Sequence, residues 1–75
     1  MSDHEAIAAI VRDVNPSIAI EPTQYDKSLF DLGLDSLDHS TILLNVEEKF
    51  GVKIPDDVAG SMVSVSEIAK FVANR

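Results

Sequence analysis

The stretch from Asp31 to Gly51, DLGLDSLDHSTILLNVEEKFG, leads from a glycine-containing loop into a predicted helix over residues 35–50 and sets the centre of the fold. Asp35 is a suitable N-cap, and Gly51 stands where helices commonly end in glycine. At about 100° per residue, four apolar side chains form a stripe wide enough to face a core. They are Ile42, Leu43, Val46 and Phe50.

Another helix is predicted at the start of the chain, over residues 2–14. Ser2 and Glu5 form a capping-box pattern. Pro16 ends the helix because proline cannot donate a backbone hydrogen bond. The apolar residues of this segment recur at helical spacing and give one stripe: Ile7, Ile10, Val11 and Val14.

Two more helices are predicted in the last third of the chain. The first is short, covers residues 55–59 and is limited by Gly60. The second opens at Ser64, where Glu67 completes another capping-box pattern. The apolar stripe of the last helix is Val65, Ile68, Ala69 and Val72. No segment shows the period-2 alternation that is typical of a strand.

Residues 17–34 have no sustained period, and Pro22 and Gly33 interrupt them. Their six apolar side chains indicate a long ordered loop attached to the core, and such loops are often functional. These side chains are Ile18, Ile20, Leu29, Phe30, Leu32 and Leu34. We also expect five large side chains in the core: Phe30, Phe50, Ile54, Met62 and Phe71. The sequence thus predicts an all-α fold in one domain, 1–75: a small four-helix bundle of three longer helices and one short helix, with the long loop between the first and second helices.

The charge of the chain restricts its partners. Thirteen acids and six bases give a net charge of −7, and eight of those acids with three of the bases lie in residues 26–57. Nucleic acid and anionic membranes are poor partners for this field, whereas a basic protein surface is a good one. No apolar run is long enough to span a bilayer, and the N-terminus lacks a signal-peptide pattern. We therefore expect a cytoplasmic protein that is not inserted in membranes.

Ser36 is the most informative single residue. It lies in the first turn of the central helix, where unpaired N–H groups and the helix dipole favour a phosphate. Asp35 and Asp38 oppose a phosphate electrostatically, so we expect them to serve another purpose, such as recognition by a basic enzyme surface. The chain has no cysteine, so any thiol chemistry needs a cofactor.

The motif of residues 31–38, Asp-Leu-Gly-Leu-Asp-Ser-Leu-Asp, resembles the attachment motif of acyl carrier proteins. The resemblance continues through residues 47–50, 54–56 and 65–72. It implies a four-helix bundle that is not an enzyme and has no catalytic residue. It also implies that a phosphopantetheinyl transferase moves 4'-phosphopantetheine from coenzyme A onto Ser36, with Asp35 and Leu37 beside it. The thiol of that arm then holds acyl cargo as a thioester.

The same resemblance predicts a surface for partner enzymes with basic docking sites. Acids on this surface attract such a partner, and exposed leucines add apolar burial at short range. We expect eight residues to contribute: Asp35, Leu37, Asp38, Thr41, Leu44, Glu47, Glu48 and Asp56. Thr41 replaces a common glutamate and Lys49 interrupts an acidic run, so this surface is less acidic than in a housekeeping fatty-acid carrier. This fits either a specialised pathway or lineage drift. We expect the protein to be a monomer.

Several alternatives stay open from the sequence alone. Leu37 and Leu44 have a packing role under the long loop as an alternative to docking. For His39 we favour a role in helix packing over contact with the phosphate of the arm. The spacing of the acids between Asp26 and Asp38 does not match an EF-hand loop, so we expect no metal site. The competing functions are an aminoacyl or peptidyl carrier, an unmodified protein-interaction bundle and a small hydrolase.

Overall fold

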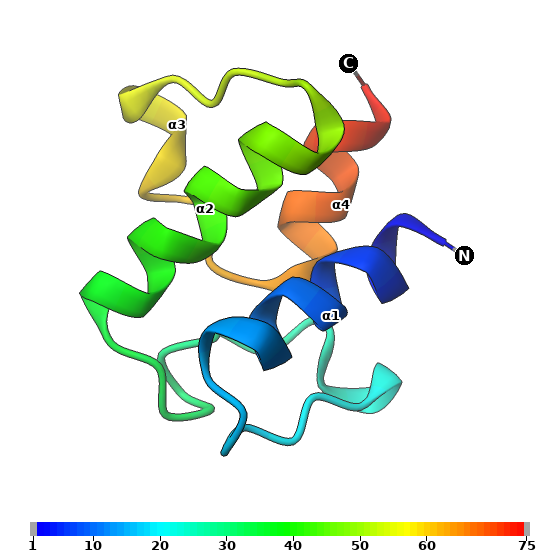
Figure 1. The fold of residues 1–75 in the computed structure, drawn as a ribbon, viewed down its shortest axis with the longest axis vertical. Helices are drawn as coiled ribbons and strands as arrows, with labels where there is room; N and C mark the ends of the chain where they lie inside the picture. The colour runs from blue at the N-terminus through cyan, green and yellow to red at the C-terminus, as the bar shows by residue number, and fades with distance from the viewer. Residues whose placement is uncertain (1, 75) are drawn as a thin grey trace.

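The computed structural model describes residues 2–74, and these residues form only helices and loops. Their helices are α1 (Asp3–Val14), the 3₁₀ turn η1 (Pro22–Gln24), α2 (Ser36–Phe50), α3 (Asp56–Ala59) and α4 (Val65–Ala73). Figure 1 shows α1 passing the lower end of α4, with α2 running diagonally between the long loop and the upper end of α4. The predicted all-α bundle of three longer helices and one short one is confirmed.

The helix ends follow the capping chemistry of the sequence. At α1, the Ser2 hydroxyl accepts the N–H of Glu5 at 3.1 Å, and the Glu5 carboxylate accepts the N–H of Ser2 at 3.3 Å. At α4, the Ser64 hydroxyl accepts the N–H of Glu67, also at 3.1 Å. The Glu67 carboxylate, however, accepts the N–H of Val63 rather than that of Ser64. The first predicted capping box is confirmed. In the second, the Glu67 carboxylate binds the N–H one residue before the N-cap, so the box is only half formed.

The core lies between α1, α2 and α4, and α1 packs against both of the other helices. Ile7, Ile42 and Ile68, one from each helix, are fully buried. Of the five large side chains expected in the core, Ile54 and Met62 are buried, and Phe50 and Phe71 are half-buried against the core.

Phe30 is the exception among the predicted core residues. Its side chain is 40% exposed, so the prediction that it belongs to the core is wrong. The reason is the backbone turn in which it lies: the N–H of Gly33 donates to the carbonyl of Phe30 at 3.1 Å. This turn buries Leu29 and Leu34 on either side of it and faces the Phe30 ring outward.

The long loop is ordered and attached to the core, as predicted. Ile20, Leu29 and Leu34 are buried. The N–H of Leu29 donates to the carbonyl of Val63 at 2.8 Å, and the N–H of Ser66 donates to the carbonyl of Tyr25 at 2.9 Å. The loop that leads to Ser36 is therefore bonded both to the segment between α3 and α4 and to the first turn of α4. Within residues 2–74, the helices are too short and polar to cross a membrane.

Candidate functional site

Ser36 is the first residue of α2, and its side chain is exposed. Asp35 is the N-cap in an extended conformation, and its Oδ1 accepts the N–H of Asp38 at 2.9 Å. In return, Oδ2 of Asp38 accepts the N–H of Asp35 at 3.4 Å. The two aspartates next to Ser36 thus form a capping box that fixes the start of α2. Both carboxylates have a structural role in addition to their charge.

The capping box leaves part of the helix start free. Among residues 2–74, no hydrogen bond is made by the N–H groups of Ser36 and Leu37. Two free N–H groups at the positive end of a helix suit a phosphate, so the residues present fit a phosphate-linked group on the Ser36 hydroxyl. Neither Ser36 nor the carboxylates of the capping box is buried, so a protein that binds here has direct access.

Gly33 and Leu34 set the approach of the chain to Ser36. Gly33 has φ +111°, a conformation that side-chain-bearing residues rarely adopt, and a Cβ there would lie 3.3 Å from Cδ1 of Ile18. Leu34 is buried, and its N–H donates to the carbonyl of Leu29 at 3.1 Å. A glycine turn and a buried leucine therefore hold Asp35 and Ser36 at the surface.

His39 packs inside the structure. Its side chain is buried, and Nε2 lies 2.8 Å from the carbonyl oxygen of Met62, so Nε2 carries the proton and donates it. The imidazole ring also lies 5.2 Å from the ring of Phe30, between centroids. The packing role predicted for His39 is confirmed. No hydrogen bond joins Ser36 to His39 in the described part of the chain, so the two do not form a nucleophile–base pair.

The face of α2 away from the core exposes two leucines. Leu37 is 74% exposed and Leu44 is 56% exposed, so neither packs under the loop. Thr41 lies between them, and its hydroxyl donates to the carbonyl of Leu37 at 3.0 Å. Glu48 is exposed on the same face. The alternative of a core role for the leucines is wrong, and the exposed stripe is available for contact.

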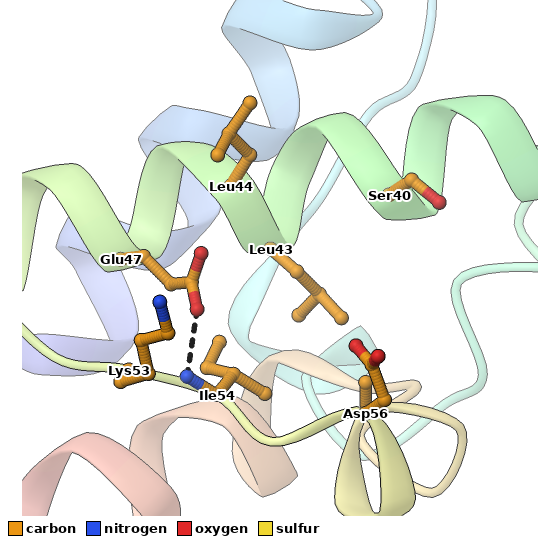
Figure 2. Close-up of a pocket in the computed structure, with 8 residues that line it drawn as sticks. Ser40, Leu43, Leu44, Glu47, Lys53, Ile54 and Asp56 are labelled. Carbon is orange, nitrogen blue, oxygen red and sulfur yellow. Dashed lines mark hydrogen bonds between the residues drawn. The ribbon is translucent and has the colours of Figure 1, made fainter.

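A groove of about 580 Å³ separates α2 from α3 and the segment before it. Figure 2 shows the Leu43 side chain pointing across this groove toward the segment that carries Ile54 and Asp56. One turn after Leu43, Oε2 of Glu47 accepts the N–H of Ile54 at 2.7 Å, which attaches this segment to α2 (Figure 2). The lining consists of Ser40, Leu43, Leu44, Glu47, Lys53, Ile54, Asp56 and Ala59.

Of the eight predicted partner residues, Asp35 and Asp38 form the capping box at the start of α2, and the other six fall into two groups. Leu37, Thr41 and Glu48 belong to the outer face of α2, whereas Glu47 and Asp56 line the groove, and Leu44 borders both. Sequence reasoning missed the other groove residues. A signal for two of them existed, because Ser40 and Leu43 follow Ser36 at i+4 and i+7, on the same side of α2 as the predicted Glu47 at i+11.

This arrangement defines a class of protein. An exposed serine with no base bonded to it among residues 2–74 stands at the start of α2, one turn before the first groove residue and near an exposed face of leucines and acids. Such a site is suited to bear a covalently attached group and to present it to other proteins.

Comparison with known proteins identifies the family. The model of the phosphopantetheine attachment site matches residues 5–72. The acyl carrier protein of Arthrobacter sp. (strain FB24) is 40% identical over 97% of this chain and 94% of its own length. The acyl carrier protein of Helicobacter pylori (strain ATCC 700392 / 26695) is 35% identical over 96% of this chain and 92% of its own length.

The chain belongs to the acyl carrier protein family, whose members are carriers and not catalysts, and its cofactor is 4'-phosphopantetheine. The expected resemblance is confirmed.

Proposed function

We propose that Ser36 is the attachment residue and that a phosphopantetheinyl transferase modifies it. The Ser36 Oγ forms a bond to the phosphorus of coenzyme A that bears the pantetheine. The bond from that phosphorus to the adenosine bisphosphate half breaks, and the hydroxyl proton passes to a base of the transferase. The observation that carries this proposal is the exposed Ser36 hydroxyl beside two free N–H groups at the start of α2. The bound arm supplies a terminal thiol for thioester formation.

In this proposal the arm lies along the groove beside α2, and the acyl cargo is buried next to it. Ser40 and Leu43 lie on α2 between Ser36 and Glu47. Ser36 and Glu47 are eleven residues apart, which is about 17 Å along the helix axis. An acyl chain enters the bundle where Leu43 and Ile54, both buried, move apart. Burial of each CH₂ group of the acyl chain contributes about 0.8 kcal/mol, so a longer chain can offset the cost of a wider opening between the two side chains.

The outer face of α2 is the proposed contact surface for partner enzymes that transfer or modify the acyl group. Exposed Leu37 and Leu44 offer apolar area, and Asp35, Asp38 and Glu48 attract basic partners. The carrier serves fatty acid, modified lipid or polyketide synthesis in this proposal. It acts as a monomer in the cytoplasm.

A second candidate is an aminoacyl or peptidyl carrier. The groove favours it because four of its eight lining residues are polar or charged, and such side chains suit a polar cargo better than a long alkyl chain. The four are Ser40, Glu47, Lys53 and Asp56.

The experiment for the proposed function uses octanoyl-coenzyme A with a broad-specificity transferase. We expect intact mass to increase by one octanoyl-phosphopantetheine. Neutral hydroxylamine should then remove the octanoyl group and leave the arm, because it cleaves thioesters. A folded chain that gains no mass, or one whose acyl group resists hydroxylamine, contradicts the carrier function and favours an unmodified interaction bundle.

A further inference from the structure

Phe30 has an exposed ring that is nevertheless fixed in place. Within residues 2–74, it is one of three exposed large apolar side chains, together with Leu37 and Leu44. The N–H of Phe30 donates to the hydroxyl of Ser28 at 3.2 Å, and its carbonyl accepts the N–H of Gly33. One side of the ring packs against His39, with the two ring planes tilted by 52°. A ring held in this way loses little conformational freedom when a partner covers it.

The position of Phe30 places it beside Ser36. His39, on which the ring packs, follows Ser36 by three residues, so the two are neighbours on the helix surface. At about 100° per residue, Ser36 lies about 60° from His39 and about 100° from Leu37, and between them. On the surface of α2, Ser36 therefore lies between Leu37 and His39, and the Phe30 ring packs on His39.

We propose that Phe30 is a contact residue for the enzyme that modifies Ser36, and this inference rests on the proposed function of Ser36. The transferase must bring its bound coenzyme A to the Ser36 oxygen itself, so its footprint surrounds this residue. Later enzymes act at the far end of the arm and have no such requirement. Because Asp31, next to Phe30, and Asp35, next to Ser36, are both exposed, the matching transferase surface is an apolar pocket bordered by lysine or arginine.

The test compares Phe30→Ala with Tyr25→Ala. Tyr25 belongs to the same loop, is half-buried, and also contacts a histidine ring, that of His4, with centroids 5.7 Å apart. It follows η1, which Figure 1 shows on the opposite side of the molecule from the start of α2. Both changes remove an aromatic ring from a histidine contact, but only one removes it next to Ser36.

Transfer of the arm from coenzyme A is measured with a broad-specificity transferase. We expect Phe30→Ala to lower kcat/KM by about tenfold, mainly by raising KM, which is the size of effect seen for a contact residue at the centre of an interface. Tyr25→Ala should change it less than about twofold, the range of residues outside an interface. Equal rates for wild type and Phe30→Ala, or equal losses in both variants, would overturn the proposal.

A second measurement does not depend on the folding of Phe30→Ala. In the Ser36→Ala variant, which cannot be modified, NMR signals of the Phe30 ring should shift when transferase and coenzyme A are added, and those of Tyr25 should stay. If the Phe30 signals do not move in the bound protein, the proposal is refuted. A failure of the proposed function itself is separate, because then the wild type gains no arm at all.

Discussion

Glu47→Ala is expected to destabilise the domain through the loss of one hydrogen bond. Oε2 of Glu47 accepts the N–H of Ile54 at 2.7 Å, and Ile54 is buried. Hydrogen bonds to charged groups contribute about 1.5–3 kcal/mol, and the lower value applies because Glu47 is half-exposed. The expected loss is thus about 1.5 kcal/mol. For a domain of this size, whose total stability is about 4–11 kcal/mol, the variant stays folded.

Thermal unfolding followed by circular dichroism measures this effect. A loss of about 1.5 kcal/mol corresponds to a decrease in Tm of about 6–12 °C for a domain of this length. Glu48→Ala is the matched control, since it removes the same charge from the next, exposed residue of α2. Any relief of repulsion in a chain of net charge −7 is common to both variants, so their difference isolates the bond.

The reasoning about Glu47 is refuted if its replacement lowers Tm no more than the replacement of Glu48. Glu47→Gln keeps an oxygen acceptor without the charge, so we expect an intermediate Tm. A fall in partner turnover for Glu47→Ala would not by itself identify a docking contact, because the same change releases the segment before α3 from α2.

Two further predictions concern the backbone and the first helix. Gly33→Ala should cost more stability than Gly51→Ala in chemical denaturation, because Gly33 has φ +111° and a close neighbour, whereas Gly51 has φ +65° and open space; equal costs would contradict this. Hydrogen bonds from the backbone N–H and hydroxyl of Ser2 lower the pKa of Glu5 below its ordinary 4.5, so their stabilisation is present above that pH and is lost as pH falls through the lowered pKa. Ser2→Ala removes the hydroxyl and keeps the backbone N–H, so an NMR titration should show a partial upward shift of the Glu5 midpoint, and an unchanged midpoint would refute the contribution of the hydroxyl.

Much of the fold was predictable because its signals are local. Asp35 and Gly51 mark the ends of α2 as expected, and the apolar spacing of α1 and α4 gives their buried sides. Phe30 was misplaced because an aperiodic loop has no face that the sequence can define, and only the turn to Gly33 decides which way the ring points.

The site was predictable only in part for the same reason. The exposure of Leu37 and Leu44 followed from the helical period of α2. The bond between Glu47 and Ile54 spans the change of direction after α2, and no periodic pattern encodes it. The bond from His39 to the carbonyl of Met62 links residues 23 apart in sequence and depends on how α2 packs against the segment before α4.

The most direct measurement is the intact mass of three folded proteins after incubation with coenzyme A and a broad-specificity transferase: the wild type, Ser36→Ala and Ser17→Ala. Ser17 is an exposed serine in the loop and provides the control. The account predicts the mass increase of a single phosphopantetheine on the wild type and on Ser17→Ala, and no increase on Ser36→Ala. A Ser36→Ala protein that still acquires the arm, or a wild type that never does, would contradict it.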